Sequence, residues 1–521
     1  MRKKPINMLK VVRVLLAVIF FAPVLLFFID FADVLPDQIG RLLHLQIVPA
    51  ILWGAGILVL IYLLLTFLFG RVYCSMICPA GVLQDIFNRI ACIGRKKKNG
   101  SMRFRYHKPA NWLRYILLSV TTLLAIFGFM EAFLLLDPYS NFGRIAANLF
   151  RPAVMWINNL FSGILSSRGN YLLYNVTIDI PAAALVSAII ALSVFAVMVY
   201  FRGRLFCNTL CPVGALLSLF SRYSLFRFTI DKDACNNCKV CERSCKAEAI
   251  SATGDGLQVT GENQIVDMAN CVACFNCISS CNKQAIKFRY APFAPFKKRQ
   301  TVNTFTESRR SFIATSATIA GSVPLLAFAQ EENSLQKITP VTPPGAISLA
   351  RFKNYCTGCH LCVVHCPSRV LKPAGFRYGL SYLLNPYMSY ENSFCNYACT
   401  VCSEVCPTHA IQPITVEQKK VIQIGVANFY IDKCVVKTEG TDCGACSEHC
   451  PTQAVHMIPY DGTITIPKVE PELCVGCGGC ESICPVRPER AIVVFANDIH
   501  QTAELPPEEE IRKIDSFDFG F

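Results

Sequence analysis

Long apolar runs separated by short charged stretches are the most regular pattern in the chain. Four of these runs, at residues 11–29, 47–69, 116–136 and 182–201, are long enough to cross the hydrocarbon core of a bilayer as helices, which takes about 17–25 residues. The composition agrees, with 53% hydrophobic and only 17% charged residues. The pattern therefore predicts an α-helical membrane domain of four spans at residues 1–227.

Charge gives the predicted spans an orientation. Residues 70–111 contain nine Lys or Arg and a single acid, Asp85, whereas residues 30–46 contain three Asp and one Arg. Because Lys and Arg collect on the cytoplasmic side of inserted helices, the amino terminus and residues 70–111 are predicted to be cytoplasmic. The net charge is +20 over residues 1–329 and −6 over residues 330–521. Since the positive charges flank apolar runs, they indicate membrane lipid as a partner and not nucleic acid.

One motif occurs twice, after the second and after the fourth predicted span. The two copies share a Gly-Arg pair, a Cys-x3-Cys-Pro sequence and a glycine, and each of these positions is offset by 133 residues. Cysteines four apart lie on one helix face, so two copies related by a pseudo-twofold axis would bring four thiols together. We interpret Cys74, Cys78, Cys207 and Cys211 as a candidate site for a further metal or cluster. The alternatives are a redox or metal-handling thiol pair in each copy, and small buried cysteines that only pack between helices, the interpretation we favour for Cys92.

Residues 228–290 are predicted to be a cytoplasmic two-cluster ferredoxin with an α+β fold. Both of its cysteine quartets have the spacing Cys-x2-Cys-x2-Cys-x3-Cys of bacterial ferredoxins, in which the fourth cysteine of each quartet ligates the other cluster. The predicted ligand sets are Cys235, Cys238, Cys241 and Cys281 for one [4Fe–4S] cluster, and Cys271, Cys274, Cys277 and Cys245 for the other. Lys246 and Asn282 replace the usual proline after the fourth cysteine. Four-thiolate zinc sites are the alternative, which two quartets in the same register disfavour.

Four more quartets follow, and each ends in Cys-Pro. They are Cys356, Cys359, Cys362 and Cys366; Cys395, Cys399, Cys402 and Cys406; Cys434, Cys443, Cys446 and Cys450; and Cys474, Cys477, Cys480 and Cys484. The inner two have a longer first gap, and like spacing predicts nested pairing of outer with outer and inner with inner. The fourth ligands would then be Cys484 for the first quartet, Cys450 for the second, Cys406 for the third and Cys366 for the fourth; sequential pairing is the alternative. The six quartets predict six [4Fe–4S] clusters and leave no ligand position for His360, His365, His409 or His449.

A linker at residues 291–344 joins the two sets of quartets. Within it, Arg309 and Arg310 precede an apolar run at residues 312–328, which leads to an Ala-x-Ala sequence ending at Ala329. A basic flank, an apolar core and small residues form a twin-arginine-like export signal. We therefore predict a fifth span at residues 312–328, an external four-cluster α+β ferredoxin domain at 345–500 and an acidic tail at 501–521. The alternatives are a linker helix with both ferredoxin parts inside, and cleavage after Ala329.

These motifs together support a resemblance to a known family. Residues 1–300, with four spans, two Cys-x3-Cys-Pro motifs and a two-cluster ferredoxin, resemble the H-type membrane subunit of periplasmic nitrate reductase systems. Residues 305–500 resemble the G-type ferredoxin subunit of the same systems, so the chain looks like a fusion of the two. The resemblance implies a bacterial inner-membrane component of a quinol dehydrogenase, which passes electrons from the quinol pool to a periplasmic reductase or cytochrome. A similar polyferredoxin family that reduces copper or assembles oxidases is the alternative.

Quinol oxidation also requires a proton acceptor near the membrane surface. An ionisable residue within a span is a functional candidate because its burial is costly. Glu131, six residues before the external end of the third span, and His44, just before the second, are the candidates for the quinol site. A solvated interfacial pair is the alternative.

Overall fold

The computed structural model describes residues 7–94, 104, 106–107, 110–231, 233–236, 238–251, 266–291, 339–462 and 464–505. It divides into two compact units. The first comprises Met1–Gln336, Cys356–His360 and Pro373–Asn385, and the second Lys337–Tyr355, Leu361–Lys372 and Pro386–Phe521. The twin-arginine segment, the fifth span, the cleavage position after Ala329 and residues 506–521 of the predicted tail lie outside the described residues.

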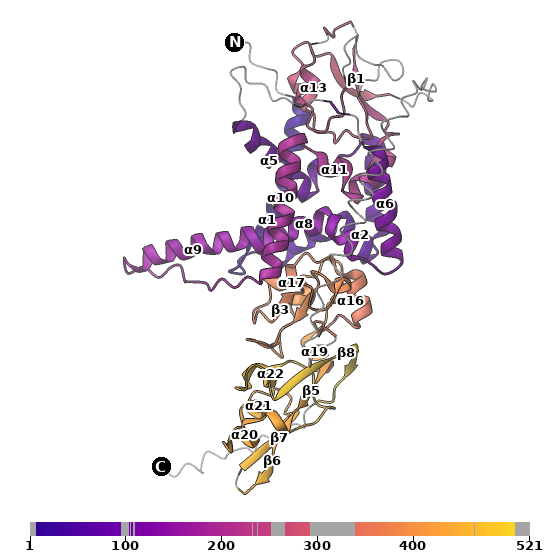
Figure 1. The fold of residues 1–521 in the computed structure, drawn as a ribbon. Coiled ribbons are helices and arrows are strands. Elements are labelled where there is room, and N and C mark those ends of the chain that lie inside the picture. Colours follow the sequence, from indigo (N-terminus) through magenta and orange to yellow (C-terminus); the bar gives the residue numbers. More distant parts are fainter. Residues whose placement is uncertain are drawn as a thin grey trace, which may run out of the picture. The chain divides into compact units, whose positions relative to one another are not determined.

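The helical part of the first unit is shown in indigo to magenta in Figure 1. Its helices are α1 (Met8–Ile29), the 3-10 helix η1 (Asp37–Leu45), α2 (Ile47–Trp53), α3 (Gly56–Phe69), α4 (Tyr73–Met76), α5 (Pro79–Gly94), α6 (Asn111–Ile126), α7 (Glu131–Leu136), α8 (Pro138–Ile145), the π-helix η2 (Ala146–Phe150), α9 (Arg151–Ser166), α10 (Ala182–Arg202), α11 (Leu205–Thr209) and α12 (Pro212–Ser221).

Two of the four predicted spans are continuous helices. Among the described residues, α1 and α10 have the length and hydropathy to cross a membrane. The second predicted span is divided into α2 and α3, where Gly54 adopts a left-handed φ of 84°, and the third into α6 and α7, where Gly128 has a φ of 86°. A left-handed residue ends the regular helix hydrogen bonding, which glycine permits at low cost. The prediction of four continuous spans is therefore not confirmed.

The two copies of the repeated motif fold alike. In each, a short helix (α4 or α11) contains the first cysteine, and a second helix (α5 or α12) begins at the proline that follows the second cysteine. Proline suits this first helical position because its fixed φ is helical and its missing N–H would have no helical partner there. The repeat seen in the sequence is thus also a repeat in structure.

The first ferredoxin segment follows α12 within the same unit. Strands β1 (Phe226–Ile230) and β2 (Ile286–Tyr290) pair antiparallel, from Phe226 opposite Tyr290 to Ile230 opposite Ile286, and enclose the short helices α13 (Val240–Ser244) and α14 (Asn276–Ser280) in sequence. Phe226 of β1 also stacks near Phe69 at the end of α3, with ring centroids 5.2 Å apart. The first ferredoxin and the helices therefore share one compact unit.

The C-terminal part, coloured orange to yellow in Figure 1, has short helices and three two-stranded sheets, as an α+β ferredoxin fold predicts. The strands are β3 (Leu371–Pro373) with β4 (Pro386–Met388), β5 (Ile422–Phe429) with β8 (Ile492–Thr502), and β6 (Val455–Asp461) with β7 (Ile464–Val469). The helices are α16 (Leu349–Tyr355), α17 (Leu361–Val364), η4 (Leu380–Tyr382), α18 (Val401–Glu404), α19 (Val416–Lys420), η5 (Ile431–Lys433), α20 (Val435–Glu439), α21 (Ala445–Glu448) and α22 (Gly479–Ile483). Its core mixes aliphatic side chains such as Ile424 and Val494 with cluster cysteines such as Cys446 and Cys480.

Candidate electron-transfer centres

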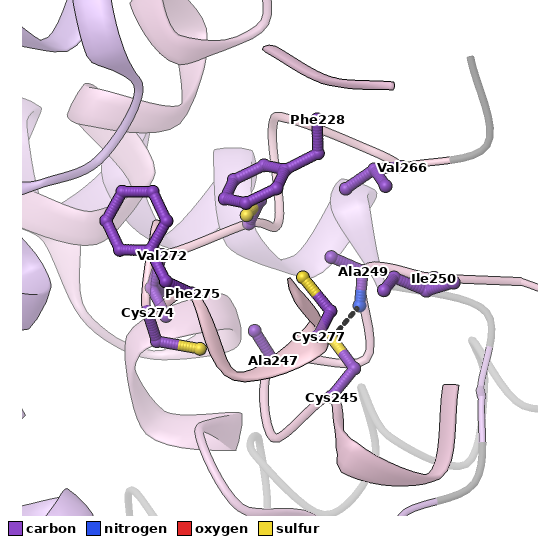
Figure 2. A pocket seen from close by; sticks show the side chains of 11 residues that line it. Phe228, Cys245, Ala247, Ala249, Ile250, Val266, Val272, Cys274, Phe275 and Cys277 are labelled. Atoms are coloured by element: carbon purple, nitrogen blue, oxygen red, sulfur yellow. Dashed lines mark hydrogen bonds between the residues drawn. The ribbon is translucent and has the colours of Figure 1, made fainter. Parts of the chain in front are cut away.

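Four cysteines of the first ferredoxin segment converge on one apolar pocket. Cys245, Cys271, Cys274 and Cys277 line it together with aliphatic and aromatic side chains; Figure 2 shows Cys245, Cys274 and Cys277 beside Phe228 and Phe275. The Ala249 backbone N–H also donates to the Cys245 sulfur at 3.3 Å. Burial, together with the nearby Cys274, raises the pKa of Cys245 to about 12. Thiols that resist ionisation when buried become stable thiolates when iron supplies the compensating positive charge, so these residues fit a [4Fe–4S] cluster.

The other ligand set of this segment also agrees with the prediction. Burial raises the pKa of Cys241 to about 11, with further contributions from Cys235, Cys238 and Cys281. Cys281 therefore lies beside the first quartet and Cys245 beside the second. This arrangement is compatible with the two ligand sets that the spacing predicts, and their role as cluster ligands stays a prediction.

The turn after the fourth cysteine is the same in five of the six quartets. The residue three positions on has a left-handed φ and donates its N–H to the cysteine carbonyl; these residues are Glu248, Gln284, Arg369, His409 and Gln453. The first two follow Lys246 and Asn282, the others follow proline. The replacement of proline at these positions therefore leaves the turn intact.

In the second unit, the quartets that begin at Cys434 and Cys474 each lie beside the last cysteine of the other. Cys434, Cys443, Cys446 and Cys484 line one pocket, among apolar side chains that include Phe429 and Val486. Cys450 lies near Cys474, Cys477 and Cys480. Burial is the largest cause that raises the pKa values of these three cysteines, and Cys450 raises them as well; the pKa of Cys477 is about 12. These two clusters form a sequential pair.

The second quartet takes its fourth ligand from the first. Burial and the nearby thiols of Cys395, Cys366 and Cys399 raise the pKa of Cys402 far above its ordinary value. Cys366 therefore lies with the second quartet and not with the fourth. The nested pairing predicted from gap lengths is therefore wrong. The gap between the first two cysteines of a quartet affects only the shape of that loop. The fourth ligand instead comes from whichever loop lies beside it in space, so gap length does not predict the pairing.

Two cluster-binding loops of the second unit meet at Cys395 and Cys477. The Cys395 N–H donates to the Cys477 carbonyl at 2.9 Å. Tyr390, which is 1% exposed, lies at the same junction and donates its hydroxyl to the Gly476 carbonyl at 2.7 Å. An added Cβ on Gly478 would lie 2.1 Å from the Tyr390 ring, so only glycine fits beside it. These contacts place the loop of Cys395 and the loop of Cys477 side by side.

The cysteines of the repeated motif form a third kind of centre, which we call the repeat thiols. Cys74, Cys78, Cys207 and Cys211 are all buried, and the thiols interact electrostatically both within and between the two copies. Among the described residues, no three His, Cys, Asp or Glu side chains converge closely enough for a single metal ion. If these four residues held a cluster, it would supply a further one-electron carrier.

Arg71 joins the repeat thiols to the first ferredoxin segment. Its fully buried guanidinium donates to the carbonyls of Cys207, at 3.5 Å, and Cys271, at 3.2 Å, and to that of Asn270. It also donates to the Asn208 side chain at 2.6 Å. One side chain thus touches the loop of a repeat thiol and the loop of a ferredoxin ligand.

Asp85 is the centre of a second connection. Arg204 approaches it to 2.7 Å, Lys246 to 2.6 Å, and Arg13 also pairs with it. The backbone N–H of Arg204 also donates to the backbone carbonyl of Lys246, at 2.9 Å. Lys246, at the position where a proline is usual, therefore fastens the ferredoxin to the helices. In the sequence these residues look like ordinary loop charges, and the recurrence of Arg71 and Arg204 within the repeat is the one signal of this role.

Buried positive charge exceeds buried negative charge around the repeat thiols. Arg71, Arg114, Arg204 and Lys246 are each at most 6% exposed, and Asp85 is the carboxylate that pairs with two of them. Buried charges are costly unless they are compensated. Four thiolates around a metal or cluster core would supply negative charge at this place. The surroundings of the repeat thiols therefore fit an anionic centre.

The candidates for the quinol site lie on two different elements of the helical part, η1 and α7. His44 is half-buried in η1 with its ring 5.3 Å from that of Trp53, and Glu131 is half-buried as the first residue of α7. Their role stays a prediction. Of the histidines near the cluster quartets, His360 is buried with its Nε2 3.1 Å from the Leu384 carbonyl, and His449 is exposed.

Comparison with known proteins relates these centres to a family. A family model described as a 4Fe-4S binding domain matches residues 51–100 and 183–232, which contain the two motif copies. A model described as a 4Fe-4S dicluster domain matches residues 440–487. The methylamine utilization ferredoxin-type protein MauM of Methylophilus methylotrophus is 30% identical over 163 residues, which make up 30% of this chain and 71% of that protein. The chain belongs to the family of ferredoxin-type proteins.

Other members match different shares of the chain. The ferredoxin-type protein MauN of Paracoccus denitrificans is 30% identical over 220 residues, 41% of this chain and 62% of that protein. The ferredoxin-type protein NapF of Escherichia coli K12 is 25% identical over 146 residues, 28% of this chain and 80% of that protein. No solved structure matches the chain. As a ferredoxin-type iron–sulfur protein, it transfers electrons.

Proposed function

We propose that this ferredoxin-type protein is a membrane-bound electron carrier that takes electrons from the quinol pool and delivers them to a periplasmic reductase or cytochrome. When bound, [4Fe–4S] clusters supply one-electron carriers. The cysteine sets support six of them, and the repeat thiols a seventh metal or cluster centre. The clusters of residues 345–500 would face the acceptor outside the bilayer.

The contacts of Arg71 are the observation that carries this proposal. They link the loop of a repeat thiol, next to the end of an apolar helix, directly to a ferredoxin ligand loop. Lys246 and Asp85 fasten the same two parts together. These contacts hold the two parts in a fixed arrangement, which favours transfer between groups that they carry.

Oxidation of a quinol releases two electrons and two protons, so proton acceptors must accompany the electron carriers. Glu131 and His44 are the proposed acceptors. The test is anaerobic addition of a reduced quinone analogue to membranes that contain the full chain, with cluster reduction followed by EPR. We expect reduction in the parent protein and slower reduction in Glu131→Gln with unchanged iron content. Clusters that dithionite reduces but the quinol does not would contradict the proposed donor.

The copper-reducing alternative predicts a different result in the same membranes. A cupric reductase would oxidise its dithionite-reduced clusters on addition of Cu(II), and this reaction would depend on the repeat thiols. If Cys74→Ala abolished it and quinol reduced no cluster, the copper function would replace our proposal.

The external position of residues 345–500 has its own test. Conservative replacement of the twin arginines, Arg309→Lys with Arg310→Lys, should leave this domain inside the cell, because the folded-protein export route reads the paired arginines. Protease treatment of intact spheroplasts should digest residues 345–500 in the parent protein and spare them in the variant. Protection of the parent domain would contradict the fifth span.

A further inference from the structure

A buried lysine points at one cluster ligand of the second unit. Lys419 is 6% exposed and uses all three ammonium protons: it donates to the Cys395 sulfur at 3.3 Å, to the Asn396 carbonyl at 2.6 Å and to the Cys399 carbonyl. The lysine lies in α19, whose start is fixed by a capping box between Thr415 and Gln418. This local structure holds the ammonium group in place.

The charge of Lys419 requires an anionic partner. Within the described part of the chain no carboxylate pairs with it, and its three acceptors are two carbonyls and a sulfur. A buried ammonium group is costly unless a negative charge lies near it. The thiolates that Cys395 and its neighbours contribute to a cluster are therefore the partner that this lysine fits.

We propose that Lys419 raises the reduction potential of the cluster held by Cys395, Cys399, Cys402 and Cys366. Gain of one electron makes a thiolate-ligated cluster more negative, and a buried cation that donates to a ligand sulfur stabilises that form. This inference rests on the proposed electron-transfer function only in that the cluster must be present.

A shift in the reduction potential of this cluster matters because of where its ligand loop lies. The Cys395 N–H donates to the Cys477 carbonyl, so the ligand loop of this cluster lies directly beside that of Cys474, Cys477 and Cys480. A raised potential retains the electron at this junction until the next carrier accepts it.

The experiment is a potentiometric titration of the full-length protein, followed by EPR, with chemical mediators instead of quinol. We expect Lys419→Met to lower the midpoint potential of one cluster and to leave the others unchanged at full iron content. Lys420→Met is the matched control, since it removes a neighbouring charge that lies over the Tyr397 ring, 5.9 Å from its centroid, and should shift nothing.

Two further variants test the inference if Lys419→Met fails to retain its cluster. If Lys419→Met loses iron, Lys419→Gln keeps a donor without the charge and should give a smaller downward shift, and Lys419→Arg should restore most of the potential. Unchanged midpoints in iron-replete Lys419→Met and Lys419→Gln, or an equal shift in Lys420→Met, would overturn the inference. Because no quinol is used, failure of the quinol donor does not affect this outcome.

Discussion

The guanidinium of Arg204 donates a hydrogen bond of 2.7 Å to the carbonyl oxygen of Cys74, across the two copies of the repeated motif. Arg71, at the equivalent position of the first copy, donates in the opposite direction to the Cys207 carbonyl at 3.5 Å. Each copy therefore holds the thiol-bearing turn of the other. This reciprocal contact is what a pseudo-twofold axis through the repeat thiols requires.

A shared centre predicts that the repeat thiols act as a unit. Cys74→Ala and Cys207→Ala should each remove the same metal content or spectroscopic signal, and the double variant should lose no more, because residues of one unit are non-additive. Metal analysis and low-temperature EPR of the purified protein measure this. Cys92→Ala is the control and should lose nothing. Two separate losses that add in the double variant would indicate independent thiol pairs.

Two glycines of the repeat should resist substitution. An added Cβ would lie 2.2 Å from the Cys74 carbonyl oxygen at Gly81, and 2.3 Å from the Cys207 carbonyl oxygen at Gly214. Gly81→Ala and Gly214→Ala should each lower the free energy of unfolding by about 1–3 kcal/mol or more, because backbone must move to relieve the overlap. Gly163→Ala is the matched helical control, since nothing lies within 4 Å of its added Cβ. It should be neutral or stabilising by up to about 1 kcal/mol in thermal unfolding in detergent.

Removal of the Asp85 charge should destabilise the first unit. Asp85→Asn leaves Arg204 and Lys246 buried without their counter-ion, which costs about 3–5 kcal/mol for a buried pair. Asp231→Asn is the control, because it removes an exposed ion pair in which the Asp231 carboxylate lies 3.8 Å from the Lys287 ammonium group. It should change the free energy of unfolding by less than about 0.5 kcal/mol. A loss in Asp85→Asn no larger than in this control would contradict the proposed fastening of ferredoxin to helices.

The same carboxylate makes a pH dependence predictable. Burial alone would raise the pKa of Asp85, but Arg204, Lys246 and Arg13 outweigh it and hold that pKa well below its ordinary value. The folded-state pKa is thus lower than the unfolded one, so the stabilisation is complete above about pH 4 and is lost as the pH falls below it. In Asp85→Asn, the part of the loss of folding stability on acidification that comes from this carboxylate should be absent.

Sequential cluster pairing can be tested by iron content. Cys366→Ser and Cys395→Ser should impair the same cluster, so the double variant should lose the iron of one cluster only. Cys366→Ser with Cys474→Ser should impair two different clusters, because Cys474 belongs with Cys450. Nested pairing would give the reverse result. Iron analysis after anaerobic purification distinguishes the two.

Local spacing was sufficient to predict the ligand loops. Three cysteines with two residues between neighbours can reach one common centre, and in the first ferredoxin segment Cys271, Cys274 and Cys277 do line one pocket together with Cys245. The repeat was likewise visible as a constant offset, because its glycines, arginines and cysteines are needed in both copies. The α+β ferredoxin folds and the cysteine-rich motifs therefore followed from the chain alone.

Contacts between distant segments were decided only by the tertiary structure. The partner of a fourth cysteine depends on which loop lies beside it, so similar gap lengths led to the wrong nesting of Cys366 with Cys474. Lys246 and Lys419 look like ordinary lysines in the sequence, yet one pairs with Asp85, 161 residues away, and the other with Cys395. Burial and charge compensation are properties of a site assembled from several segments, and no single segment contains them.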